Sequence, residues 1–264
     1  MTHAFKGTAL ITGASTGIGS LYAEGLARRG YDLVLVARNR ERLNALASRL
    51  TEQTRQNVEV LPADLGNAAD LARVERKLRE DASITLLVNN AGVGTHTPLL
   101  DSDVERMAEM ISLNITALTR LTYAAMPGFV ARGQGAVINI SSVVSLAPEL
   151  LNGVYGGSKA YVTAFTHSLH KEFAGQGIQV QAVLPGATAT DFWAIGGLPV
   201  SNLDPGIVMS AQDLVDGALQ DFENGVLISI PSLHDLQAFE QYEASRKALL
   251  GQLSSSQLAS RYSH

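Results

Sequence analysis

A serine, a tyrosine and a lysine stand at spacings that suit acid–base chemistry. Tyr155 and Lys159 are four residues apart in a helical pattern that runs to about Phe173, so their side chains share one helix face. Ser142 follows the apolar run 136–140, and α/β sheets bind their ligands at the carboxyl ends of strands. A phenol with a pKa of roughly 10 is a poor acid–base group near neutrality. We expect Lys159 to lower the pKa of Tyr155, so that this phenol exchanges a proton with a substrate oxygen held by Ser142.

The same three residues also have a simpler interpretation. Tyr155 and Lys159 can be an ordinary pair on a helix surface, and Ser142 can be a turn or capping residue. The Tyr–Lys spacing alone favours the simpler interpretation, because it occurs often by chance. The surrounding chain has to decide between the two.

A glycine-rich stretch near the N-terminus predicts a nucleotide site. The apolar run 7–12 breaks into glycine-rich residues 13–19, and an amphipathic helical pattern follows to about Arg29. In this strand–turn–helix context, the backbone closely approaches a pyrophosphate at the helix N-terminus. The spacing is G-x-x-x-G-x-G, which differs from the G-x-G-x-x-G of other dinucleotide folds. The expected cofactor-binding residues of this loop are Gly13, Ser15, Thr16, Gly17, Ile18 and Gly19.

The end of the second apolar run, 31–37, indicates which nucleotide is bound. NAD sites usually carry an acidic residue about 20 positions after the loop, where it hydrogen-bonds the ribose 2′-hydroxyl. Here Arg38 and Arg40 follow the run and no acid is present. A guanidinium suits a 2′-phosphate, so we expect NADP(H), with Arg38 as the main contact and Arg40 and Ser15 as helpers. The alternative is that both arginines are simply solvated at a helix start.

Composition argues against several other classes of protein. The 264 residues carry a formal charge of −5, which argues against nucleic-acid binding. The absence of cysteine excludes disulfides, thiolate catalysis and cysteine-ligated metals. No apolar run approaches the ~18 residues of a membrane span, and the first 13 residues lack the pattern of a secretion signal. We expect a cytoplasmic protein with neither nucleic-acid nor membrane partners.

Apolar runs alternate with helical patterns along most of the chain. This alternation predicts a parallel sheet covered on both faces. We expect an α/β, doubly wound, Rossmann-type domain at 1–231, with seven parallel strands and helices on both faces, and a helical extension of the same domain at 232–264. Leu236, Phe239 and Tyr242 would share a helix face with Leu249 in that extension. The expected strands are 7–12, 31–37, 58–65, 84–92, 136–140, 178–186 and 225–231, and the expected helices lie near 19–29, 39–53, 67–80, 101–126, 155–173 and 211–222.

Together these motifs resemble the short-chain dehydrogenase/reductase family, in its single-domain branch. The resemblance runs from about residue 6 to 231. Ser142 fits the family pattern better than Ser141, because it lies 13 residues before Tyr155. The motifs occur in the family's order: Thr12–Gly19, Asp64, Asn89–Gly92, Asn114, Ser142, Tyr155 with Lys159, and Pro185–Thr190.

The resemblance implies a role for each motif. Tyr155 would be the catalytic acid/base, and Ser142 would orient the substrate carbonyl. Lys159 would lower the pKa of Tyr155 and bind the nicotinamide ribose, and Asn114 would hold a water that links Lys159 to solvent. Taken singly, such residues are also ordinary helix, turn or capping residues. The further cofactor contacts that the resemblance implies are Asp64, Leu65, Asn90, Ala91, Gly92, Pro185, Gly186, Thr188 and Thr190.

The substrate is expected between the loops 92–97 and 143–154 and the segment 187–210, which the resemblance implies is a mobile lid. Neither 143–154 nor 187–210 contains Arg or Lys. This favours a neutral, mostly apolar ketone, aldehyde or secondary alcohol over an anionic substrate. The expected substrate contacts are Ser142, Val144, Tyr155, Phe192 and Trp193.

Further expectations concern the histidines and the oligomeric state. His96 either faces the substrate pocket or is an exposed loop residue. His167 and His170 lack a third ligand at a sensible spacing, so we expect no metal site. The resemblance implies a homotetramer or homodimer, formed through the helices at 101–126 and 152–173.

The sequence therefore predicts an NADPH-dependent carbonyl reductase that also works as an alcohol dehydrogenase. The alternative from another class is an NADP(H)-binding sensor or scaffold of the same fold that has lost catalysis. The presence of both Tyr155 and Lys159 favours the enzyme. Their spacing of four disfavours an enoyl reductase, and the chain lacks the extra substrate domain of a sugar-nucleotide epimerase.

Overall fold

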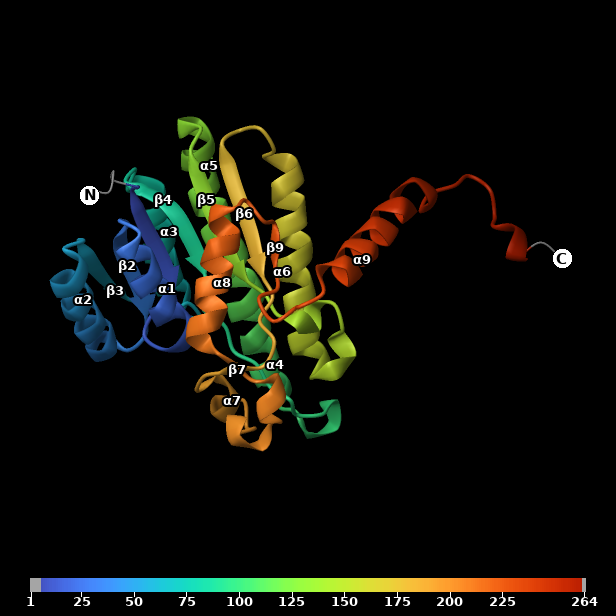
Figure 1. Ribbon diagram of the computed structural model, residues 1–264, viewed down its shortest axis with the longest axis horizontal. Coiled ribbons are helices and arrows are strands. Elements are labelled where there is room, and N and C mark those ends of the chain that lie inside the picture. The colour runs from blue at the N-terminus through green and yellow to red at the C-terminus, as the bar shows by residue number, and fades with distance from the viewer. Residues whose placement is uncertain (1–5, 263–264) are drawn as a thin grey trace. The chain divides into compact units, whose positions relative to one another are not determined.

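A seven-stranded parallel sheet forms the centre of the larger part of the chain in the computed structural model, which describes residues 6–262. The strand order is β3-β2-β1-β4-β5-β6-β9, so the chain winds outward in both directions from β1 and β4 (Figure 1). This arrangement confirms the predicted doubly wound fold with seven parallel strands. The strands are β1 (Thr8–Thr12), β2 (Asp32–Ala37), β3 (Val58–Pro62), β4 (Ile84–Asn89), β5 (Gly135–Ile140), β6 (Ile178–Val183) and β9 (Ile228–Ser229).

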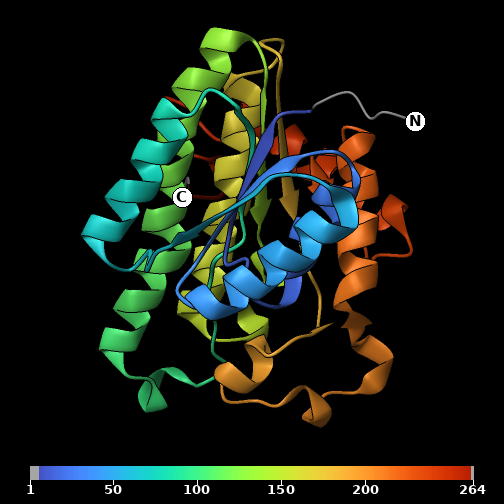
Figure 2. The same ribbon diagram turned by 90° about the vertical axis from the view of Figure 1, so that its left-hand side faces the viewer.

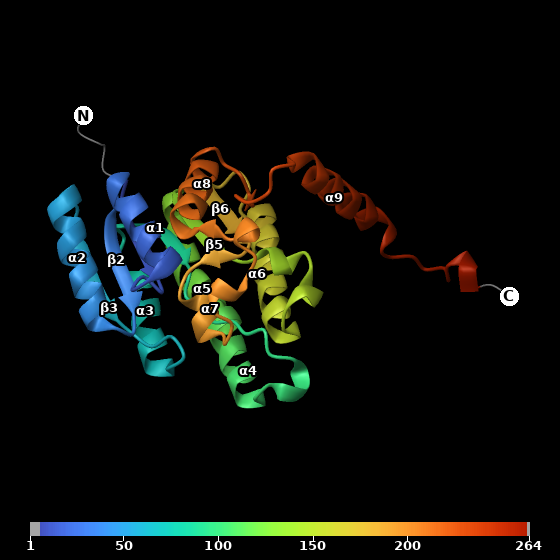
Figure 3. The same cartoon turned by 60° about the horizontal axis from the view of Figure 1, so that its bottom comes forward.

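Helices cover both faces of this sheet, as Figure 3 shows. One layer contains α1 (Gly17–Arg28), α2 (Arg40–Thr54) and α8 (Ala211–Glu223), and the other contains α3 (Ala68–Glu80), α5 (Leu118–Arg132) and α6 (Gly153–Glu172). Strand β2 shows why the strands are apolar throughout. Its Leu33 and Leu35 are buried in the first layer, whereas Val34 and Val36 on the opposite face are turned away from it.

The long helical pattern predicted at 101–126 is interrupted. It consists of α4 (Val104–Ile111), a π-helical segment (Ser112–Ala117) and then α5, and a 3₁₀ turn at Leu99–Asp101 precedes them. A π-helical segment is rare and often lies at a functional site. Asn114 lies inside it and is only 2% exposed. The apolar periodicity alone does not reveal such a local change of helix type.

The segment that follows β6 lies at the carboxyl end of the sheet, below it in Figures 1 and 2. Two short strands, β7 (Thr188–Ala189) and β8 (Met209–Ser210), pair in parallel and bring the two ends of this segment together. Between them lies the one-turn helix α7 (Phe192–Ile195), in which the side chains of 194 and 195 are outside the described residues. The last strand of the sheet is shorter than the predicted 225–231, because only Ile228–Ser229 pair with β6.

The described residues from 232 to 262 belong to a separate compact unit. It contains α9 (Leu236–Leu249), at whose start the Asp235 carboxylate accepts a hydrogen bond from Gln237 N at 2.9 Å. The rings of Phe239 and Tyr242 stack with their centres 6.1 Å apart.

None of the helices within residues 6–262 is both long enough and apolar enough to cross a membrane. The first five residues of the stretch that we read for a secretion signal lie outside the described part of the chain.

Candidate active site

Helix α6 carries Tyr155 and Lys159 at the carboxyl edge of β5. Asn152 caps this helix, because its side-chain oxygen accepts hydrogen bonds from Val154 N at 2.9 Å and Tyr155 N at 3.3 Å. Tyr155 and Lys159 are each only 6% exposed. The two residues are therefore not a surface pair, which was the simpler interpretation of their spacing.

The two serines after β5 point in different directions. The Ser142 hydroxyl donates to Pro185 O at 3.3 Å and lies near enough to the Tyr155 phenol to lower its pKa. The Ser141 hydroxyl instead donates to Lys159 O at 2.8 Å, on the underside of α6. The structure thus brings Ser142 beside Tyr155, as the sequence predicts, and keeps Ser141 away from the phenol.

Burial moves the pKa values of Tyr155 and Lys159 in opposite directions. Loss of solvent raises the pKa of Tyr155 to about 12, and the nearby Ser142 hydroxyl offsets part of this rise. Loss of solvent also lowers the pKa of Lys159 to about 8. In the chain alone the pKa of Tyr155 therefore lies above that of a free phenol, and a lowering by Lys159 stays a prediction. The Lys159 ammonium lies 5.8 Å from the Tyr155 ring centre and donates to Ile140 O at 2.9 Å.

Asn114 joins the loop after β4 to the catalytic helix. Its side chain accepts a hydrogen bond from Val93 N at 3.0 Å and donates to Val93 O at 2.8 Å and to Ser158 Oγ at 3.1 Å. A Cβ at Gly92 would lie 3.1 Å from Asn114 Oδ1 and 3.6 Å from Lys159 Nζ. The amide oxygen and the ammonium therefore face the same glycine, and the water between them remains a prediction.

The loop between β1 and α1 fits a pyrophosphate. Gly13 and Gly17 have φ angles of 66° and 57°, in the left-handed region that glycine adopts readily. A Cβ at Gly19 would overlap the Gly13 carbonyl oxygen. Thr16 precedes α1 without capping it, and the first turn of α1 contains no acid, so its N–H groups are free to bind an anion. Ser15 in this turn and Ile18 in the first turn of α1 are both half-buried.

We expect Gly19→Ala to weaken dinucleotide binding and to destabilise the fold. The new Cβ would overlap the Gly13 carbonyl oxygen and the Asn90 amide, and backbone cannot swing aside as a flexible side chain does. Overpacking of this kind costs about 1–3 kcal/mol. Calorimetric titration with NADPH and thermal unfolding should both show the loss. Gly157→Ala is the matched control, because nothing lies within 4 Å of its added Cβ. An unchanged Kd and Tm for Gly19→Ala would contradict the close packing of this loop.

The ends of β2, β3 and β4 add further candidate cofactor residues. Arg38 is exposed just after β2, next to Asn39, which caps α2. Asp64 is exposed after β3 and accepts a hydrogen bond from Gly66 N at 2.9 Å. After β4, Asn90 Nδ2 donates to Thr12 O at 2.8 Å and so holds the glycine loop. A narrow hollow at this edge is lined by Thr12, Leu65, Asn89, Ala91, Leu113, Ala117, Leu118 and Leu121.

The segment after β6 meets the glycine loop from the other side. The Thr188 hydroxyl donates to Gly186 O at 3.0 Å, which tightens the turn after Pro185. Thr190 Cγ2 would lie 3.4 Å from a Cβ at Gly17. The structure therefore brings the residues predicted for the nicotinamide side next to those predicted for the phosphates.

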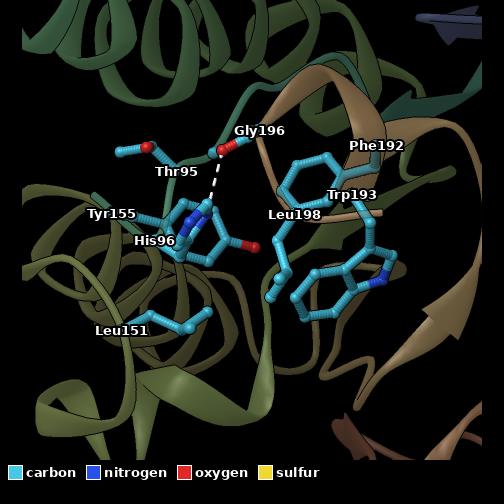
Figure 4. A pocket seen from close by; sticks show the side chains of 9 residues that line it. Thr95, His96, Leu151, Tyr155, Phe192, Trp193, Gly196 and Leu198 are labelled. Atoms are coloured by element: carbon cyan, nitrogen blue, oxygen red, sulfur yellow. Dashed lines mark hydrogen bonds between the residues drawn. The ribbon is translucent and has the colours of Figure 1, made fainter. Parts of the chain in front are cut away.

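A small apolar cavity adjoins Tyr155 (Figure 4). The ring of Phe192 lies 5.8 Å from that of Tyr155, and Trp193 meets Phe192 edge-on at 6.1 Å. Phe192 also packs on the buried cluster of Met110, Val144 and Tyr155. The cavity measures about 10 Å³, and the described residues that line it include no Lys or Arg: Gly94, Thr95, His96, Leu151, Tyr155, Phe192, Trp193, Gly196 and Leu198.

The comparison with family models decides the class of protein. The model described as short chain dehydrogenase matches residues 7–195. The chain belongs to the short-chain dehydrogenase/reductase family. Proteins of this family are oxidoreductases that use a nicotinamide cofactor, and the loop Gly13–Gly19 is the candidate site for its pyrophosphate.

Two solved structures of this family resemble the chain over nearly its whole length. The short-chain dehydrogenase from Sphingobium yanoikuyae, in complex with NADPH, is 47% identical with a TM-score of 0.94, covering 97% of this chain and 99% of its own. The bulky-bulky ketone specific alcohol dehydrogenase from Comamonas testosteroni is 41% identical with a TM-score of 0.90, covering 99% of this chain and 100% of its own.

Curated relatives match a smaller part of the chain. The very-long-chain 3-oxoacyl-CoA reductase of Anas platyrhynchos is 37% identical over 186 residues, which is 69% of this chain and 60% of that protein. The match thus spans about three fifths of the length of this relative.

Two residues of this dehydrogenase's site have roles that the sequence left open or missed. His96 lines the cavity, and its Nδ1 lies 3.0 Å from Gly196 O, so this nitrogen is the donor because a carbonyl only accepts. Asn152 caps α6 and also donates to Thr97 O at 2.7 Å and to Ser102 Oγ at 3.3 Å. An asparagine just before a helical pattern is a recognisable capping signal, but its contact with the 97–102 loop is visible only in the structure.

The described residues contain no candidate metal site. Within the described residues, no group of three His, Asp or Glu side chains is arranged to hold a metal ion.

Proposed function

We propose that this short-chain dehydrogenase/reductase is an NADPH-dependent carbonyl reductase that also works in reverse as an alcohol dehydrogenase. Its substrates would be neutral, mostly apolar ketones, aldehydes or secondary alcohols. The observation that carries the proposal is the buried group of Ser142, Tyr155 and Lys159 beside an apolar cavity. A proton donor at an apolar cavity suits the reduction of a neutral carbonyl.

The side chains divide the proposed reaction between them. Bound nicotinamide would supply the hydride in reduction. The Tyr155 phenol would give its proton to the carbonyl oxygen as charge develops there, and the Ser142 hydroxyl would hold the same oxygen by a hydrogen bond. A pKa of about 12 keeps the Tyr155 phenol protonated throughout the neutral range in the chain alone. For efficient proton transfer, this pKa would have to fall toward the working pH in the complex with cofactor and substrate.

Lys159 would connect the phenol to the solvent. A pKa of about 8 lets this buried ammonium exchange a proton near working pH. Gly92 leaves space between Lys159 Nζ and the Asn114 amide oxygen, where a water would complete the path. Lys159 would also donate to the nicotinamide ribose, in place of its present bond to Ile140 O.

The preference for NADPH rests on Arg38. The residue is exposed at the end of β2, and no acid occurs from 36 to 40. The Arg38 guanidinium could therefore hydrogen-bond a 2′-phosphate, with no carboxylate in this stretch to repel it. The 47% identical dehydrogenase from Sphingobium yanoikuyae was solved with NADPH bound, which supports the same choice here.

Arg38→Ala is expected to raise the KM for NADPH about 10- to 100-fold, because a hydrogen bond to a charged group contributes about 1.5–3 kcal/mol. The KM for NADH, which lacks the 2′-phosphate, should hardly change. Steady-state kinetics with both cofactors checks this difference. Arg42→Ala is the matched control, since Arg42 is an exposed arginine on the adjoining helix α2. Equal losses with both cofactors would contradict the assignment of Arg38.

The substrate class is tested by loss of NADPH absorbance with a panel of compounds. Neutral ketones and aldehydes should be reduced, in line with the ketone specificity of the Comamonas testosteroni enzyme. Acyl-CoA thioesters, which the Anas platyrhynchos relative's name implies for that protein, should be poor substrates because 143–154 and 187–210 contain no Arg or Lys. Reduction of a 3-oxoacyl-CoA but of no neutral ketone would overturn the proposed class.

A further inference from the structure

The cavity beside Tyr155 is too small for a ketone. Its volume of about 10 Å³ is room for about one water molecule. Phe192 fills the adjoining space, with its ring 5.8 Å from that of Tyr155 and tilted by 46°. A substrate whose carbonyl reaches the Tyr155 hydroxyl must therefore displace a side chain, and Phe192 is the large one that lies against the phenol (Figure 4).

Gly94 provides the space in which the Phe192 ring lies. A Cβ at Gly94 would overlap Phe192 Cζ and would lie 3.0 Å from Tyr155 Cε2. The backbone of Gly94 is not in the left-handed region, so the chain conformation does not require glycine at this position. Its effect is to leave a niche beside Tyr155 that accepts a six-membered aromatic ring.

The remaining walls of this niche are apolar. Phe192 packs on the cluster of Met110, Val144 and Tyr155, with Val93 and Leu151 at its edge. An aromatic ring taking the place of Phe192 would meet the same side chains and would leave no polar group without a partner. The niche is therefore suited to an aryl group and unsuited to a charged one.

Two hydrogen bonds between described residues hold the short turn that carries Phe192. Helix α7 is a single turn and is followed by Gly196 and Gly197, the latter with φ 90°. The hydrogen bond from His96 Nδ1 to Gly196 O holds one end of the turn. The bond from Trp193 Nε1 to Thr188 O, at 2.9 Å, holds the other. A ring that competes for the niche has only this short turn to displace.

We propose that Phe192, in the absence of substrate, occupies the subsite for an aromatic ring of the substrate, and that Gly94 is the residue that determines its width. This inference rests on the proposed carbonyl reduction and deepens it. The preferred substrates are aryl ketones, with the aryl ring between Gly94 and Tyr155 and the carbonyl oxygen at Tyr155 and Ser142. The opposing idea is that Phe192 stays in place and forms a fixed wall.

Kinetics with acetophenone and 2-butanone separate these two ideas. Gly94→Ala should lower kcat/KM for acetophenone by about 10- to 100-fold, the effect of one methylene in a tight apolar pocket, while 2-butanone is spared. Phe192→Ala should lower the KM for acetophenone, because a competitor for the niche is removed. Gly157→Ala, with nothing within 4 Å of its Cβ, should match wild type. Equal losses for both ketones in Gly94→Ala, or a raised acetophenone KM in Phe192→Ala, would overturn the inference.

A binding measurement keeps this inference separate from the proposed function. The chain has one tryptophan, Trp193, whose ring meets Phe192 at 6.1 Å, so its fluorescence should change when Phe192 moves. With NADP⁺ present, acetophenone cannot be reduced, and its titration should give a saturable change that 2-butanone does not give and that Gly94→Ala abolishes. If that change occurs but NADPH supports no turnover, the reductase function fails and the subsite stands. If both ketones are reduced but neither the fluorescence nor Gly94→Ala separates them, the subsite fails and the function stands.

Discussion

Replacing Tyr155 with phenylalanine should abolish carbonyl reduction while NADPH binding persists. Phenylalanine keeps the ring that packs on Phe192 and removes only the hydroxyl near Ser142. General acid catalysis contributes about 10²–10⁴-fold, so kcat should fall at least 100-fold. Removing a buried hydroxyl from this apolar site should not unfold the domain, and an unchanged Tm would show that. Loss of NADPH absorbance measures turnover, and calorimetric titration measures binding.

Tyr161→Phe is the control for this experiment. Tyr161 lies on the same helix, and its hydroxyl hydrogen-bonds Thr119 at 2.8 Å, away from the cavity. Its loss should leave kcat unchanged. Substantial turnover by Tyr155→Phe would mean that another group donates the proton. A wild-type protein that binds NADPH and reduces no ketone or aldehyde would favour the sensor or scaffold alternative.

The sheet was predictable because its physical signals are local. Each strand is a short apolar run. In β2, successive side chains are buried under opposite helix layers, so both faces of the strand are apolar. Helices in between fix the strands as parallel. The π-helical segment Ser112–Ala117 was missed because it changes the hydrogen bonding of the helix without a Pro, a Gly or any other local signal.

The proposed catalytic group was predictable from spacing, but its electrostatics were not. Four residues along a helix place Tyr155 and Lys159 on one side, whatever the rest of the chain does. Their pKa values depend on burial by elements far away in the sequence, including Phe192 and the β5 carboxyl end. The spacing alone therefore could not show that burial raises the pKa of Tyr155 in the chain alone.

Contacts between distant loops account for the rest of what the sequence left open. Gly94 and Phe192 are 98 residues apart, and nothing in either neighbourhood indicates that a missing Cβ in one makes room for the ring of the other. The hydrogen bond between His96 and Gly196 spans 100 residues. Such contacts form because the loops that follow β4 and β6 meet in the folded chain. Only the structure shows them.

Carbonyl reduction should decline as the pH rises through about 8, and Lys159 should be the cause. Burial lowers the pKa of Lys159 from 10.5 to about 8, so the ammonium predominates below that pH and is lost above it. Tyr155, with a pKa of about 12, keeps its proton over this range and does not explain the decline. Lys159→Met should be roughly 100-fold less active and should show no inflection near pH 8. Lys171→Met, which removes an exposed lysine of the same helix, should keep the wild-type profile.

Lys159 should make the free energy of unfolding rise with pH over the range in which the activity falls. The unfolded chain keeps the proton of this lysine up to a pKa of about 10.5, whereas the folded chain loses it near 8. The unfolded state thus binds more protons between these values, and the contribution of Lys159 to the free energy of unfolding rises with pH over that window. Activity that falls between pH 8 and 10 therefore cannot be explained by this lysine unfolding the protein. Measuring Tm beside kcat for wild type and Lys159→Met, each across that window, separates the two effects. A wild-type rate that stays level to pH 10 would show that Lys159 keeps its proton in the complex with NADPH or plays no part in proton delivery.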